Sequence, residues 1–153
     1  MTVRQRSHKR ILSGVCAAIL IGLFGCSQKT SDEHLQAAQA FIEQDKTQAA
    51  IVELKNAIQL DPQSAAARFA LGKIYIDKGD FSGAEKELQR ALDLGQPASQ
   101  VVPLLSQAYQ RTGAHNALTD MDHTMAALTV PEQLQVGFYK LQAFIELQQI
   151  EDA

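Results

Sequence analysis

The 153-residue chain contains only two cysteines, Cys16 and Cys26, so no disulfide can form in the sequence after Cys26. A chain without disulfides must be held together by packing, and hydrophobic residues make up 46% of the sequence. The chain also lacks a Gly-x-Ser-x-Gly elbow, a phosphate-binding glycine loop, a zinc-protease signature and a Cys-His pair. We therefore predict no enzyme activity, no catalytic residues and no cofactor.

Acidic residues are absent before Asp32, and a basic segment precedes an uninterrupted apolar run, 11–24. A membrane-spanning helix needs about 20 apolar residues, so the run is short for a permanent anchor. This arrangement predicts a secretory signal peptide over residues 1–25. The basic residues that precede the run are Arg4, Arg6, Lys9 and Arg10.

The run ends in Leu23-Phe24-Gly25-Cys26-Ser27, which resembles the bacterial lipobox, although Phe24 is bulkier than the small residue usual there. The resemblance implies that Cys26 is acylated, that residues 26–30 link it to the fold, and that acyl chains attach the protein to a membrane. The residue after Cys26 is Ser27 and not Asp, which would retain the protein in the inner membrane. The resemblance therefore implies a location on the periplasmic face of a Gram-negative outer membrane. The alternative is an uncleaved anchor with Cys26 a simple thiol; both place the rest outside the cytoplasm.

Basic residues are too few for a nucleic-acid partner. Once the four basic residues of the signal are removed, ten Lys and Arg remain against seventeen Asp and Glu, a net charge of −7. No basic stripe with interleaved aromatic residues is present. We therefore expect no nucleic acid to bind.

Residue types recur at a period of 34, which is typical of helical repeat proteins. The pattern predicts an all-α fold, an α-solenoid of antiparallel helical hairpins preceded by the signal and lipid-anchor segment. The recurring sets are Ala50 and Ala84, Leu54 and Leu88, Ala57 and Ala91, Leu71 and Leu105, and the aromatic residues Phe41, Tyr75 and Tyr109.

The second unit, residues 65–98, resembles a complete tetratricopeptide repeat. Gly72 and Ala84 are small where two antiparallel helices must approach closely. Gly79 is suited to end the first helix in a left-handed conformation, and Asp80 to cap the second. The first unit, residues 31–64, keeps this pattern but has Gln44-Asp45 in place of the Gly-Asp turn.

The third unit, residues 99–131, has a degenerate second helix, because Leu118 replaces a small residue and Asp122 an apolar one. Pro103 predicts a late start of its first helix, near Val101. Residues 132–153 predict an incomplete fourth unit, with one helix after Pro131 and a partner helix from residue 150. The sequence resembles a fragment of a longer array.

Three stretches, 49–57, 67–73 and 99–105, resemble the tetratricopeptide-repeat lipoproteins of the PEP-CTERM system. The resemblance covers about residues 12–113 and includes Arg68 where most repeats have a large apolar residue. It implies a periplasmic scaffold for protein–protein interactions in exosortase-type sorting and exopolysaccharide export. The alternative is a pilotin-like or outer-membrane assembly lipoprotein that escorts a secretin or β-barrel subunit.

The family binds ligands on the concave face of its first helices, and this implies a groove of mixed apolar and amide character. Without the Lys and Asn pattern that clamps a terminal carboxylate, an extended or helical peptide is the expected ligand. The alternative is that the apolar members only fill the core between repeats and that Lys73 pairs with Asp77. The groove residues are Leu35, Gln39, Ile42, Phe69, Lys73, Ile76, Asp77, Gln107 and Gln110.

Two polar stretches of the sequence are predicted to bind no ligand. Asp120, Asp122, His123 and nearby His115 contain metal-ligand types, but the spacing is unspecific and we predict no metal site. The charged residues between Glu85 and Asp93 are expected to form a solvated convex face that needs no partner.

Overall fold

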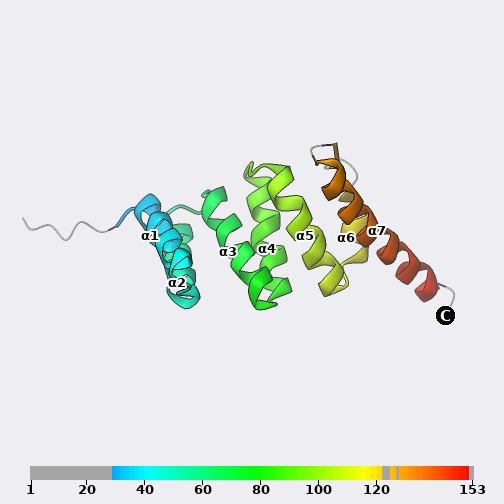
Figure 1. The fold of residues 1–153 in the computed structure, drawn as a ribbon, viewed down its shortest axis with the longest axis horizontal. Helices are drawn as coiled ribbons and strands as arrows, with labels where there is room; N and C mark the ends of the chain where they lie inside the picture. Colours follow the sequence, from blue (N-terminus) through cyan, green and yellow to red (C-terminus); the bar gives the residue numbers. More distant parts are fainter. Residues whose placement is uncertain (1–28, 122–124, 127, 152–153) are drawn as a thin grey trace, which may run out of the picture.

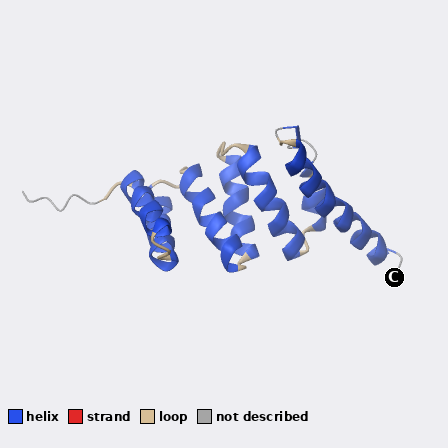
Figure 2. Ribbon diagram, viewed as in Figure 1, coloured by secondary structure: helices blue, strands red, loops and turns tan. Residues whose placement is uncertain are grey.

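The computed structural model describes residues 29–121, 125–126 and 128–151, and these residues form helices joined by turns, with no strand among them (Figures 1 and 2). The helices lie side by side in chain order along the long axis of the molecule (Figure 1). They are α1 (Ser31–Glu43), α2 (Thr47–Leu60), α3 (Ala65–Lys78), α4 (Phe81–Asp93), α5 (Ala98–Thr112), α6 (His115–Thr119) and α7 (Val130–Glu151).

Small residues allow the helices of the first two hairpins to approach closely. Ala50 and Ala84 are fully buried in α2 and α4. A Cβ atom added to Gly72 would lie 2.6 Å from Cγ of Leu88, so α3 and α4 meet where only glycine fits. The close approach that the sequence predicts at Gly72 and Ala84 is confirmed.

The turns within the hairpins share one backbone conformation at equivalent positions of the repeat. Gly79 and Gly113 both have φ of 74°, and Asp45 holds the same left-handed region at 56°. After Gly79, the side chain of Asp80 accepts a hydrogen bond from the Gly83 amide at 3.0 Å and caps α4. The glycine turn and the aspartate cap are confirmed in hairpin two, while hairpin one places a non-glycine residue in the strained position.

Helix α5 begins at Ala98, before the predicted start near Val101, and that prediction is wrong. Val101 and Val102 are completely buried, and the Pro97 carbonyl accepts hydrogen bonds from the amides of Gln100 and Val101 at 2.9 and 3.3 Å. The burial of these valines and the two hydrogen bonds extend the helix toward its N-terminus. Pro103 therefore lies in the helix interior, although it has no amide hydrogen to donate. The second helix of this hairpin, α6, has only five residues.

Helix α7 is continuous for 22 residues and includes Ile150 and Glu151, so the predicted start of a new helix at residue 150 is wrong. No proline or glycine interrupts the chain between Gly137 and Glu151, and nothing in that stretch favours a turn. At the other end, Pro131 lies in the first turn, where its missing amide costs no hydrogen bond. There the amide of Thr129 donates to the Glu132 carboxylate at 2.8 Å.

The buried apolar residues form two clusters, one contributed by α1 to α3 and one by α4 and the later helices. Helix α7 joins the second cluster through Val136 and Ala143. The opposite side of α7 carries large apolar side chains that are exposed to solvent: Val130, Leu134, Phe138, Leu141, Phe144 and Ile145.

None of the helices in the described part of the chain is long and apolar enough to cross a membrane.

Candidate interaction sites

The structure places the predicted groove residues on the first helices of three successive hairpins, α1, α3 and α5. Four of them are exposed: Gln39, Ile42, Lys73 and Asp77. The other five are partly buried: Leu35, Phe69, Ile76, Gln107 and Gln110. The surface that a partner could contact on these helices is therefore more polar than the set as a whole.

The partly buried apolar residues of this set also pack inside the molecule. Leu35 packs against the cluster of α1 to α3, and Phe69 and Ile76 pack against the second cluster. These three side chains thus make the core contacts that the alternative interpretation expects. Their substitution would change stability as well as any partner contact.

Lys73 lies over an aromatic ring. Its Nζ is 5.8 Å from the centroid of the Phe69 ring, within the range of a cation–π interaction. Among the described ion pairs, none joins Lys73 to Asp77. The structure therefore brings together Lys73 and Phe69, and leaves the Asp77 carboxylate exposed to solvent.

The same register continues onto α7, where its character changes. Leu141 lies one repeat period after Gln107, and Phe144 lies one repeat period after Gln110. Both side chains are 59% exposed. In the register of Leu141 the earlier residues are Gln39, Lys73 and Gln107, so this position changes from polar to apolar on α7. In the register of Phe144 the residues on α1 and α3, Ile42 and Ile76, are already apolar.

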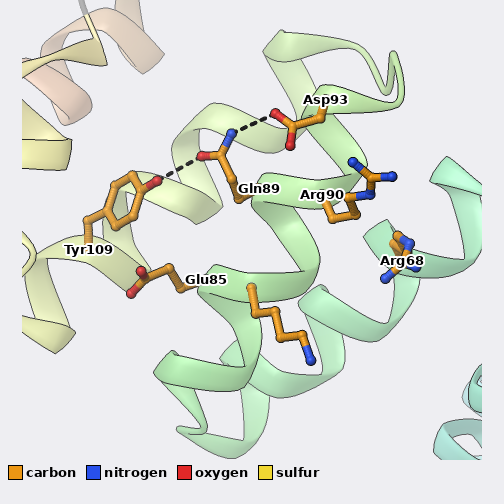
Figure 3. Close-up of a pocket in the computed structure, with 7 residues that line it drawn as sticks. Arg68, Glu85, Gln89, Arg90, Asp93 and Tyr109 are labelled. Atoms are coloured by element: carbon orange, nitrogen blue, oxygen red, sulfur yellow. Dashed lines mark hydrogen bonds between the residues drawn. The ribbon is translucent and has the colours of Figure 1, made fainter.

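An open cleft of about 480 Å³ lies along α4, between residues of α3 and α5 (Figure 3). Within it, the Tyr109 hydroxyl donates to Gln89 Oε1 at 2.7 Å, and Gln89 Nε2 donates to Asp93 at 2.9 Å. Burial, together with the charges of Glu85 and Asp93, raises the pKa of Tyr109, so the phenol keeps its proton as a donor. The residues that line the cleft are Arg68, Glu85, Lys86, Gln89, Arg90, Asp93 and Tyr109.

These contacts correct, for two residues, the prediction that the charged stretch of α4 forms a solvated face. The Glu87 side chain is only 12% exposed and pairs with Arg68. Gln89 links α4 to α5 through Tyr109. The prediction was wrong at Glu87 and Gln89, because charge alone does not show which side of α4 the neighbouring helices cover, whereas Lys86, Arg90 and Asp93 are exposed.

Arg68 holds the second hairpin together and joins it to the preceding turn. Its Nη1 donates to Glu87 Oε2 at 2.8 Å, which ties α3 to α4. Its Nε and Nη2 both donate to the Pro62 carbonyl, at 3.2 and 3.1 Å. The residue that is unusual for a tetratricopeptide repeat therefore has a structural explanation.

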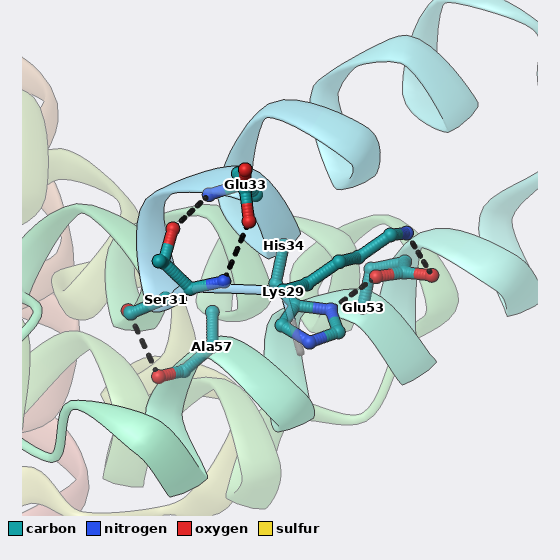
Figure 4. Close-up of polar contacts among 7 residues, drawn as sticks. Lys29, Ser31, Glu33, His34, Glu53 and Ala57 are labelled. Carbon is teal, nitrogen blue, oxygen red and sulfur yellow. Dashed lines mark hydrogen bonds and ion pairs between the residues drawn. The ribbon is translucent and has the colours of Figure 1, made fainter. Parts of the chain in front are cut away.

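The first hairpin has a hydrogen-bonded pair at the equivalent positions (Figure 4). His34 and Glu53 lie one repeat period before Arg68 and Glu87, and the His34 ring donates from Nδ1 to Glu53 Oε2. The two side chains are 14% and 17% exposed. We call these two contacts the cross-hairpin pairs, because each joins the first helix of a hairpin to the second.

Residues just before and at the start of α1 reinforce the pair of the first hairpin (Figure 4). Lys29 Nζ lies 3.5 Å from Glu53 Oε1, and the Ser31 hydroxyl donates to the Ala57 carbonyl at 3.0 Å. The hydrogen bond from His34 is the main cause that holds the pKa of Glu53 below its ordinary value, against the effect of burial, and Lys29 acts in the same direction. Glu53 therefore stays ionised at mildly acidic pH.

The third hairpin has apolar residues at these positions. Val102 and Met121 lie one repeat period after Arg68 and Glu87, and both belong to the second core cluster. The cross-hairpin pairs were not among the predicted site residues. The signal that could have identified them is a basic or imidazole residue followed at a fixed spacing by glutamate, twice at the repeat period.

Several predicted residues lie outside the described residues: Cys26 of the lipobox, and Asp122 and His123 of the polar cluster. Of the other members of that cluster, His115 forms a contact of 3.0 Å with Glu146, which ties α6 to α7. Within the described part of the chain, no group of three or more His, Cys, Asp or Glu residues could hold a metal ion.

The arrangement defines an all-helical protein built from repeated antiparallel hairpins. Residues 41–108 match the family model of the tetratricopeptide repeat, a range that runs from the end of α1 through most of α5. No curated protein matches the chain at a significant level. The match supports the tetratricopeptide interpretation for these hairpins, and repeats of this kind generally mediate protein–protein interactions.

Proposed function

We propose that the chain is a scaffold that binds a protein or peptide along the first helices of its hairpins. The observation that carries this proposal is the exposure of groove positions on α1 and α3 and of the equivalent positions on α7. The exposed residues are Gln39, Ile42, Lys73 and Asp77 on α1 and α3, and Leu141 and Phe144 on α7. Exposed apolar patches with polar surroundings are typical of surfaces that bind proteins.

We also propose that acyl chains on Cys26 hold this scaffold on the periplasmic face of the outer membrane. The lipobox sequence supports the anchor, and the resemblance to PEP-CTERM-system lipoproteins supports a role in exosortase-type sorting and exopolysaccharide export. The linker from residue 26 to α1 spans at most about 18 Å when fully extended, so the first hairpin would lie close to the bilayer.

The groove is tested by site-specific photocrosslinking in cells of the native organism. A photoreactive residue at Asp77, which is exposed on α3, is compared with one at Lys55, which is exposed on α2 and outside the groove register. We expect a discrete crosslinked protein at Asp77 and none at Lys55. The double variant Lys73→Ala, Asp77→Ala tests the same groove by loss of partner capture. Both side chains are exposed, so the fold should persist.

A crosslink at position 55 but not at 77 would contradict the groove. Ile76 is left intact because it packs against the core, and its loss would confuse binding with stability. The identity of the captured protein separates the roles: a component of sorting or polysaccharide export supports the proposal, and a secretin or β-barrel subunit opposes it. For the anchor, an unmodified mass of the mature protein would contradict acylation at Cys26.

A further inference from the structure

The first hairpin differs from the second in the chemistry of its cross-hairpin pair. Arg68 keeps its charge at every pH that a protein meets, because a guanidinium is not deprotonated in proteins. A histidine side chain changes charge between about pH 5 and 8. The same structural position is therefore permanently charged in one hairpin and titratable in the other.

We propose that the His34–Glu53 pair is a pH-sensitive latch, which holds α1 on α2 when the imidazole is protonated and loosens when it is not. Glu53 is ionised in both charge states of the ring, so a protonated imidazole adds the attraction between opposite charges to a hydrogen bond that the carboxylate already strengthens. The imidazolium therefore contributes more to the hairpin than the neutral ring in the same place. His34 lies on α1, the helix that carries the groove positions Leu35, Gln39 and Ile42, so the latch would affect how firmly these residues are held; this consequence alone rests on the proposed function.

The surroundings of His34 are suited to this role. The ring is 14% exposed, and a cavity of about 380 Å³ beside it gives water access to it. Glu53 on α2 contacts the ring, and the other polar residues that line the cavity with it are Lys29 before α1 and Asn56 and Gln59 on α2. Glu53 is the only carboxylate bonded to the ring in the described residues, so its bond with His34 is the one that titration changes.

Lys29 limits the size of the response. Its ammonium group remains paired with Glu53 when the imidazole is neutral, so Glu53 is not left without a cation. The hairpin should loosen and not unfold. We expect a difference of about fivefold in the local opening equilibrium between the two charge states of the ring, because the attraction between opposite charges in such a pair contributes about 1 kcal/mol.

The latch also has a lower pH limit. The pKa of Glu53 is lowered in the folded protein, so its contribution is present above the ordinary carboxyl range. It is lost as the pH falls through the folded value, when the carboxylate takes up a proton. The latch therefore needs an ionised Glu53 as well as a protonated imidazole.

Amide hydrogen exchange of the full chain, measured at about pH 5 and about pH 8 and corrected for intrinsic rates, tests the latch. We expect the protection of α1 and the start of α2 to fall about fivefold at the higher pH, and that of α3 and α4 to stay constant. The matched variant His34→Arg copies the second hairpin, and its first hairpin should be equally protected at both values.

Two further variants keep the test decisive. His34→Gln should leave the first hairpin weakly protected at both pH values. This variant provides the control if His34→Arg does not fold. His115→Gln removes the imidazole that contacts Glu146 and should leave the response of the first hairpin unchanged. A response that persists in His34→Arg or His34→Gln, or constant protection of the first hairpin in the wild type, would overturn the proposal. The readout needs no partner, so its failure is distinct from failure of the groove.

Discussion

The second and third hairpins use the same two repeat positions in opposite ways. In the second, Arg68 and Glu87 form an ion pair that a backbone carbonyl also supports. In the third, Val102 and Met121 are buried among apolar side chains. A repeat register thus fixes where two helices must be joined and leaves open which chemistry joins them.

The apolar version of these two positions, Val102 and Met121, occurs in the hairpin whose architecture differs from the others. The third hairpin has the shortest described helix, α6, and both α5 and α6 contact the long helix α7 as well as each other. Its core is continuous with that of α4 and α7, whereas α1 to α3 form a separate cluster. The first two hairpins are similar units, and the third depends on its contacts with α7.

The largest effect is expected when a charge is placed in the apolar version. Val102→Arg puts a guanidinium at a position with no exposed surface, and it should lower the free energy of unfolding by about 4 kcal/mol, because the buried charge has no partner. Chemical denaturation followed by circular dichroism measures the loss. Met121→Glu added to this variant should recover part of it, and no recovery would show that the position cannot accept an ion pair.

A smaller and opposite effect is expected at the turn of the first hairpin. Asp45 has φ of 56°, where its equivalents are Gly79 and Gly113. Asp45→Gly should raise stability by up to about 1 kcal/mol, because it removes the cost of a side chain in the left-handed region. Thermal unfolding measures the change, with Gly79→Ala as the reverse substitution. Destabilisation by Asp45→Gly would mean that the Asp45 side chain has a role that the turn geometry does not show.

The sequence was sufficient for features that depend on neighbouring residues. Gly79 and Asp80 specify their turn locally, and the period of 34 predicts the helical hairpins without knowledge of their contacts. The start of α5 could not be predicted in this way, because the burial of Val101 and Val102 outweighs the local effect of Pro103. The continuity of α7 was missed because the repeat pattern led us to expect a turn.

The candidate site likewise combines features that the sequence predicts with features that depend on packing. The period places the groove residues on α1, α3 and α5, but which of them are exposed depends on packing between hairpins. Phe69 and Ile76 show this, since both contact the second core cluster. The contact between Arg68 and Glu87 is long-range, and only the repetition of its spacing in His34 and Glu53 could have revealed it.

The most direct test of the shared register is a double-mutant cycle that transfers the apolar version into the second hairpin. Arg68→Val alone should cost about 2–3 kcal/mol of unfolding free energy, because it leaves Glu87 partly buried without its cation. Glu87→Met alone should cost less, since Arg68 keeps its hydrogen bonds to Pro62. The double variant should return to within about 1 kcal/mol of the wild type. A loss equal to the sum of the two single losses would contradict the account.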